Sequence, residues 1–210
     1  MTKTIVITDT LVSDAFQKMS FGSQSDVRDA TDADSTLTRE LLEIYTGHST
    51  MDFESWHAQR AALVYTPPAG IILSKAILRL WCNLKSAGST DLIFVKGDGV
   101  HPSIPVVVAD FNRAYWGSLV KRVSTATINI NAWNDIEIPV SGLIVNGKIK
   151  LYGLTGKDYD NIPIPENNTY GIRFDGSDYP HPPKIELTYF IPQQAFKNGL
   201  YVKNPLGQYV

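Results

Sequence analysis

Short apolar runs recur along the chain, and none of them repeats with the spacing of a helical stripe. Several runs alternate strictly, as where Ile136, Ile138 and Val140 are interleaved with Asp135 and Glu137. A period of two sends successive side chains to opposite faces of a strand, so one face meets a core and the other meets water. The pattern predicts strands over residues 4–7, 61–65, 76–81, 92–95, 105–108, 127–130, 135–140, 148–154, 170–174 and 184–190.

Turn-forming residues separate these runs. Asn146-Gly147 lies between two apolar runs, and this dipeptide favours a two-residue type I′ hairpin turn, which needs positive φ at both positions. Proline and glycine clusters also interrupt the chain at 67–70, 97–99, 163–165 and 180–183. Many short strands separated by turns predict an all-β fold, a jelly-roll-like antiparallel β-sandwich.

Two segments do not follow the alternation. Residues 26–48 are polar at first and then carry several large aliphatic side chains, which fits a long loop followed by either a short helix or a strand. Residues 109–118 predict one helical turn that packs Phe111 and Trp116. We find no internal repeat and no low-complexity tract.

The C-terminal segment differs from the rest of the chain. Residues 191–210 are interrupted by glycine, proline and amide residues, yet they carry more apolar surface than a solvated tail. They form either a final pair of strands on the same domain or an arm that docks on a neighbouring subunit. We therefore divide the chain into a sandwich domain at 1–190 and a C-terminal arm at 191–210. The arm would dock through Phe196, Leu200, Tyr201, Leu206 and Tyr209.

Composition and charge exclude several classes of protein. The 210 residues are 43% hydrophobic and carry a net charge of -2, which is typical of a folded domain and excludes an overall basic nucleic-acid binder. Apolar runs are too short for a membrane span of roughly 18 residues. The single cysteine, Cys82, excludes an internal disulfide, and its apolar strand predicts a core position. The N-terminus lacks the pattern of a signal peptide, so we expect folding in a cytoplasm.

Motifs for catalysis are missing from the sequence, and we expect no enzymatic activity. There is no G-x-S-x-G nucleophile elbow, and the glycines at 97–99 lack the Lys-Ser/Thr pair of a phosphate-binding loop. The four histidines show no metal-binding spacing. Acidic residues do gather in loops, where they either bind calcium or remain solvated; they are Asp26, Asp29, Asp32, Asp34, Asp158, Asp160, Asp175 and Asp178.

Aromatic residues give the remaining candidate site. Trp81 lies in an apolar strand and is predicted to be core, whereas Trp133 is predicted to cover an end of the sandwich. Trp56, Tyr115 and Trp116 lie in less regular segments. Their flat rings either pack in the core or stack on a glycan or a protein partner, and we take these three as candidate contact residues.

The order of these segments resembles carbohydrate-binding-module-like sandwiches of the DNRLRE type over about residues 1–190. An aromatic-ended strand, a Pro-Gly turn and an alternating strand match at Tyr65, Pro68, Gly70, Ala76, Leu78 and Leu80. A W-N-x-I-x-I element matches at Trp133, Asn134, Ile136 and Ile138. The closing strand pair matches at Phe174, Ser177, Pro182, Pro183, Ile185, Leu187 and Tyr189. The D-N-R-L-R-E string itself is absent, and the matching positions are core and turn positions.

The resemblance implies a non-catalytic β-sandwich. Members of that group are typically exported, whereas this chain shows no leader pattern, which favours a virion that assembles inside the host cytoplasm. The leading hypothesis is a bacteriophage virion structural protein, such as a capsid decoration, head-fibre or tail component. It would assemble with itself or with other virion proteins and could also adhere to a host-surface glycan. The alternative is a carbohydrate-binding module, and neither hypothesis involves nucleic acid or a membrane.

Overall fold

The protein is a jelly-roll-like antiparallel β-sandwich. The computed structural model describes residues 2–8, 12–37, 41–50, 54–192, 196–197 and 200–201, with the backbone alone at 12–16, 37, 196–197 and 200–201. Twelve strands join into one sheet whose main order is β1-β12-β6-β11-β4-β5-β10-β7-β8. Three further strands attach to this path, because β2 pairs with β5, β3 with β2, and β9 with β6. All strand pairs of this sheet are antiparallel.

The described strands are β1 (Thr2–Ile7), β2 (Val12–Ser20), β3 (Ser35–Leu37), β4 (Leu41–Ser49), β5 (Ser55–Tyr65), β6 (Ile72–Lys85), β7 (Asp91–Gly97), β8 (Trp116–Ser124), β9 (Ala132–Ile138), β10 (Ile149–Thr155), β11 (Asn168–Asp175), β12 (Lys184–Phe190), β13 (Phe196–Lys197) and β14 (Leu200–Tyr201). The described helices are short. They are α1 (Gln24–Arg28), α2 (Gly156–Tyr159) and the 3-10 turns η1 (Val108–Phe111), η2 (Arg113–Tyr115) and η3 (Thr125–Thr127).

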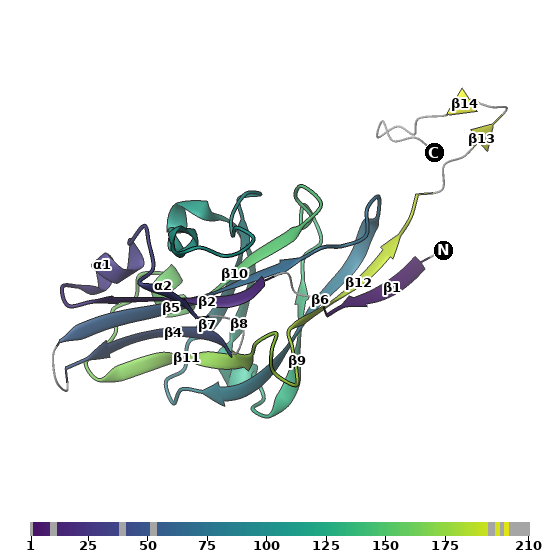
Figure 1. Ribbon diagram of the computed structural model, residues 1–210. Coiled ribbons are helices and arrows are strands. Elements are labelled where there is room, and N and C mark those ends of the chain that lie inside the picture. Colours follow the sequence, from purple (N-terminus) through teal and green to yellow (C-terminus); the bar gives the residue numbers. More distant parts are fainter. Residues whose placement is uncertain are drawn as a thin grey trace.

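A change of partner along β5 produces the two layers of the sandwich. One edge of β5 pairs with β2 along most of its length. The other edge pairs first with β4, at residues 55–59, and then with β10, at residues 61–65. The part of β4 that precedes Tyr45 in the sequence does not pair with β5. It lies beneath β5 in a lower layer, together with β11 and β6. Figure 1 shows β4 and β11 on one side of β5 and the short helices α1 and α2 on the other.

Apolar side chains fill the space between the layers, and we call this set the inner core. The alternation in β5 and β10 places Ala61, Leu63 and Leu151 against Leu42 and Ile44 of the lower layer. Other members come from β6, β9, β11 and β12, and they include Leu78, Leu80, Cys82, Ile136, Phe174 and Leu187. Burying such side chains is the main source of the stability of this fold.

A second core covers the outer face of β5, β7 and β10. It contains Ala62, Ile93 and Tyr152 from these strands, together with Val27 of α1 and Phe111 of η1. The short helices and the loop after β7 thus close a face that would otherwise expose apolar side chains. This arrangement adds a partial third layer to the sandwich (Figure 1).

The structure confirms most of the sequence-predicted strands and corrects others. Asn146 and Gly147 have φ of 50° and 71°, and Val145 and Lys148 exchange hydrogen bonds as in a two-residue hairpin turn. Residues 105–108 and 127–130 are not strands: they are irregular backbone apart from residue 108, where the 3-10 turn η1 begins, and residue 127, where η3 ends. The undecided segment 26–48 contains the strand β4, and the helical turn expected at 109–118 is present as η1 and η2, with Phe111 buried.

Two tryptophans lie elsewhere than predicted. Trp81 is not a core residue, because the outer face of β6 carries it while Leu80 and Cys82 point inward. Trp133 is its cross-strand partner on β9 and does not cover an end of the sandwich. The two rings meet edge-on with centroids 5.8 Å apart, and His181 stacks on Trp81 at 3.9 Å. Cys82 is fully buried as expected, and burial raises the pKa of its thiol.

The C-terminal strands form a separate small sheet. β13 and β14 pair with each other and are not part of the twelve-stranded sheet. Figure 1 shows them beyond the ends of β1 and β12. Of the predicted arm residues, Leu206 and Tyr209 lie outside the described residues, and Phe196, Leu200 and Tyr201 are described by their backbone alone. The arm as a docking element therefore stays a prediction.

Candidate functional site

A groove of about 370 Å³ crosses five strands on the outer face of the lower layer. It runs over β2, β5, β4, β11 and β6, which at a strand spacing of about 4.8 Å gives a span of about 19 Å. We call it the sheet groove, and its described lining residues are Gln17, Met19, Glu43, Tyr45, His57, Gln59, Leu84, Thr169 and Arg173. Its length fits an extended ligand that lies across the strands.

Strand register brings these distant residues into rows. One row consists of Met19, His57, Gly47 and Thr169, and the next consists of Gln17, Gln59, Tyr45 and Gly171. Residues directly opposite each other in a sheet share a face, so each row is a continuous strip of the groove. The alternate residues of β4, Leu42 and Ile44, point into the inner core. Alternation along β4 therefore places one set of its side chains in the inner core and the other set in the groove.

Two glycines beneath the floor of the groove make room for its rings. A β-carbon at Gly47 would lie 2.2 Å from Cε1 of His57, and one at Gly171 would lie 2.5 Å from Cδ1 of Tyr45. Neither glycine has a positive φ, so sterics rather than backbone conformation require them here. Without side chains at 47 and 171, the rings of His57 and Tyr45 lie across the neighbouring strands.

Burial keeps both ring side chains uncharged. Desolvation lowers the pKa of His57, which favours the neutral imidazole. Desolvation also raises the pKa of Tyr45, although the nearby Arg173 partly opposes the shift, so its phenol stays protonated. The floor therefore offers apolar ring surface together with neutral polar edges.

An ion pair lies beside these rings. Glu43 and Arg173 face each other across β4 and β11, and Nε of Arg173 donates to Oε1 of Glu43 at 2.6 Å. Glu43 is the single carboxylate among the described lining residues, so the groove does not present the two opposed acids of a glycosidase. Amide and hydroxyl groups of Gln17, Gln59 and Thr169 add donors and acceptors. Such a surface is suited to holding a polar ligand.

Exposed apolar side chains mark the two ends of the groove. Met19 on β2 is 43% exposed and Leu84 on β6 is 45% exposed. A polar centre between two apolar ends can bind a ligand that presents both hydroxyl groups and C–H surface. Sequence reasoning missed this site because β2 and β4 were not identified as strands. The available signal was the alternation of Leu42 and Ile44 with Glu43, Tyr45 and Gly47.

The structure places the three sequence-predicted contact residues together at the second core, away from the sheet groove. All three are half-buried and pack against that core. Trp56 stacks on His48 at 3.6 Å, and Tyr115 stacks on His101 at 3.6 Å. Their role in contacting a glycan or a partner stays a prediction.

Trp116 covers a buried arginine. Its ring lies 4.6 Å from the guanidinium carbon of Arg60, whose other side contacts the ring of Phe111 at 3.8 Å. Arg60 is fully buried, and it donates to both carboxylate oxygens of Asp158 and to the carbonyl oxygens of Phe111 and Arg28. This packing gives Trp116 a structural role in addition to any contact with a ligand.

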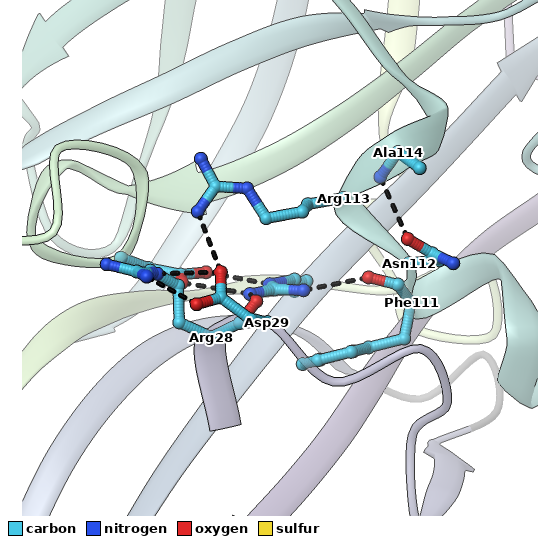
Figure 2. A network of polar contacts seen from close by, with 8 residues as sticks. Arg28, Asp29, Phe111, Asn112, Arg113 and Ala114 are labelled. Carbon is cyan, nitrogen blue, oxygen red and sulfur yellow. Dashed lines mark hydrogen bonds and ion pairs between the residues drawn. The ribbon is translucent and has the colours of Figure 1, made fainter. Parts of the chain in front are cut away.

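A surface layer of charges surrounds this arginine. Figure 2 shows Asp29 between Arg28 and Arg113, with Asn112 holding the backbone amide of Ala114. The two arginines lower the pKa of Asp29, mainly through the hydrogen bond from Arg28. The network connects α1 to the loop that carries η1 and η2, and it thereby fixes the cover over the second core.

Several aspartates of the acidic loops pair with neighbouring side chains. Asp34 pairs with Lys18, Asp158 with Arg60, and Asp160 with Arg122. Asp175 accepts hydrogen bonds from Asn83 and His181. Within the described residues, no group of three or more histidine, cysteine or acidic side chains is arranged to hold a metal ion. The possible calcium site therefore gains no support from these residues.

The comparisons with known proteins give a distant structural likeness. No family model and no curated protein matches the chain. One similar solved structure comes from work on the promiscuous specificity of carbohydrate-binding modules from the β-sandwich superfamily. It has 9% sequence identity and a TM-score of 0.29, and the match covers 90% of this chain and 56% of that chain. The chain thus spans little more than half the length of this neighbour. Among the described residues, no helix is long and apolar enough to cross a membrane.

Proposed function

We propose that this chain is a non-catalytic β-sandwich that binds a glycan in the sheet groove. The observation that carries the proposal is the floor of the groove, where the rings of His57 and Tyr45 lie over Gly47 and Gly171 beside the Glu43–Arg173 pair. A sugar ring presents C–H surface on its faces and hydroxyl groups at its edge. Flat rings contact the former, and a mixture of donors and acceptors binds the latter.

The length of the groove supports a polymer as the ligand. A span of about 19 Å exceeds a single sugar ring, and both ends are open at Met19 and Leu84. The resemblance of residues 1–190 to modules of the DNRLRE type agrees with this role. In the proposed mechanism, binding is reversible and the protein changes no covalent bond.

Affinity electrophoresis in gels that contain polysaccharides tests the proposal. The panel consists of galactomannan, arabinoxylan, mixed-linkage β-glucan and dextran. We expect at least one polymer to retard the full-length protein. His57→Ala and Gln59→Ala should each weaken this retention about tenfold, because each removes a polar contact worth on the order of 1.4 kcal/mol.

Tyr115→Ala is the matched control, because it removes a ring from the sequence-predicted site at the second core. It should leave retention unchanged if the sheet groove is the binding site. Loss of retention in Tyr115→Ala but not in His57→Ala would move the site to the second core. Melting temperatures of all variants show whether a loss reflects unfolding. The absence of retention by every polymer would contradict glycan binding.

We also propose that the protein acts in a bacteriophage virion, where it assembles with itself or with other virion proteins. The pairing of β13 with β14 outside the twelve-stranded sheet supports this role, because these two strands are not part of the sheet that forms the sandwich. Its sequence neighbourhood is rich in apolar residues. Glycan binding and assembly are compatible, since a virion surface protein can adhere to a host glycan.

A further inference from the structure

The charges of the sheet groove cancel. Among its nine described lining residues, Glu43 and Arg173 are the acid and the base, and they pair with each other. His57 and Tyr45 are kept neutral by burial, as described above. The other described lining residues are amides, a threonine and apolar side chains. A ligand in the groove therefore meets polar groups without a net charge.

The geometry of the Glu43–Arg173 ion pair keeps the two charges together. Nε and Nη2 of Arg173 approach the same oxygen, Oε1 of Glu43, at 2.6 and 2.5 Å. The Glu43 side chain is only 11% exposed, so it cannot turn away into solvent, whereas the Arg173 side chain is 35% exposed at the surface of the groove. An anionic ligand would have to compete with Glu43 for the guanidinium while approaching a carboxylate of like charge.

Hydroxyl groups suit the pair better than ions do. The remaining oxygen of Glu43 accepts hydrogen bonds, and the Nη1 group of Arg173 donates them. A sugar carries several hydroxyl groups, so one can donate to the carboxylate while another accepts from the guanidinium, and neither needs to disturb the ion pair. Hydrogen bonds to charged groups are stronger than those between neutral groups, which makes the pair an effective anchor for a neutral sugar.

We infer that the sheet groove selects neutral polysaccharides over acidic ones and that Glu43 is the residue that sets this preference. This inference rests on the proposed function and adds the charge class of the ligand. Glu43 acts by occupying Arg173, which would otherwise be a binding site for carboxylates.

The test compares each polymer of the panel in its native and its carboxymethylated form, by affinity electrophoresis of the full-length protein. The wild-type protein should bind the carboxymethylated form of the retained polymer about tenfold more weakly. Glu43→Gln frees Arg173 and should tighten binding of the carboxymethylated form about tenfold. Glu137→Gln is the matched control: it makes the same change on the exposed face of β9, outside the groove lining, and should behave as the wild type.

Arg173→Gln provides an independent variant. It leaves the Glu43 carboxylate without its partner, so it should weaken binding of the carboxymethylated polymer further. It should also increase retention by the diethylaminoethyl derivative of the same polymer, which is cationic. Weaker binding of the anionic polymer together with stronger binding of the cationic one tests the inference even if Glu43→Gln does not fold. The melting temperature of Glu43→Gln shows whether it folds.

Two results overturn the inference while leaving glycan binding intact. One is a wild-type protein that binds the carboxymethylated polymer as tightly as the native one. The other is a folded Glu43→Gln or Arg173→Gln variant whose preference between charged and native polymers does not change. Absence of binding to all native and carboxymethylated polymers contradicts the proposed function itself, so the two failures are distinguishable.

Discussion

At the residue scale, Arg60 has the most demanding environment in the described molecule. Its guanidinium is fully buried and donates to Asp158 at 2.7 and 2.9 Å and to two backbone carbonyl oxygens at 2.7 Å. Through these bonds β5 holds the end of α1, the end of η1 and the helix α2. Removing one partner of such a pair leaves an uncompensated buried charge, which costs far more than the pair itself contributes.

Asp158→Asn should therefore lower the free energy of unfolding by about 3 kcal/mol, measured by urea denaturation at neutral pH. Asp160→Asn is the matched control two residues away. Asp160 pairs with Arg122 at the surface, and Arg122 keeps Asp91 as a second partner, so the loss should stay below about 1 kcal/mol. Equal losses in the two variants would contradict the structural role of the buried pair.

The sequence could not reveal this environment. Arg60 lies just before the strand predicted at 61–65, and its carboxylate partner lies 98 residues further along the chain. Trp116 gave a clearer signal, because an aromatic residue in an irregular segment stood out as a contact candidate. The local pattern predicted the helical turn beside Trp116, but the position of its ring over Arg60 depends on how the loop after β7 packs on β5, which is a long-range contact.

At the scale of elements, local patterns predicted the strands that carry their own apolar alternation. β12 (Lys184–Phe190) has the predicted bounds, and the Asn146-Gly147 turn has positive φ at both residues. β2 and β8 were missed, because residues 12–20 and 116–124 carry few regularly spaced apolar residues. Pairing with β5 and β7 makes them strands. The sheet groove depends on these long-range registers, so the sequence alone did not show it.

The glycine in β4 offers a test of the groove at this scale. Gly47→Ala places a β-carbon 2.2 Å from the present position of the His57 ring and should displace that ring from the floor. We expect retention by the bound polysaccharide to fall about tenfold, since a contact worth on the order of 1.4 kcal/mol is lost. Affinity electrophoresis measures the change, with circular dichroism to verify the fold.

Gly147→Ala is the matched control in the hairpin turn. A β-carbon there has open space around it, but φ is 71°, so alanine pays about 1 kcal/mol in backbone strain. It should lower the melting temperature and leave retention unchanged. If Gly47→Ala also affects stability alone, the ring of His57 is not part of the binding surface.

At the scale of the whole molecule, one sheet supplies both layers and the groove. Because β5 changes partner from β4 to β10, the inward-facing residues of the two layers enclose the inner core. In the strands of the lower layer, the residues that alternate with these inward-facing residues form its outer face. Polar side chains at Glu43, Gln59 and Arg173 are thus placed on a surface whose shape is set by the apolar alternation beneath it.

The jelly-roll-like sandwich itself followed from strand alternation and turn spacing. The division into a sandwich at 1–190 and an arm at 191–210 rests on the sequence, with β13 and β14 as the described part of the arm. The sequence distinguishes this segment because its apolar residues do not alternate regularly with polar ones. Whether these residues dock on a neighbour depends on a second chain, which intramolecular patterns cannot specify.

Assembly through the arm gives a prediction for the full-length protein. We expect the wild-type chain to form an oligomer in solution, measured by multi-angle light scattering, and Tyr201→Asp to reduce it to a monomer without lowering the melting temperature. A carboxylate at 201 would have to lose its hydration in an apolar contact, which is strongly unfavourable. Tyr179→Asp is the matched control, because Tyr179 is 39% exposed on the sandwich domain and should tolerate the charge. A wild-type monomer would contradict self-association, and an oligomer that persists in Tyr201→Asp would place the contact outside the arm, on the exposed edges of the sandwich.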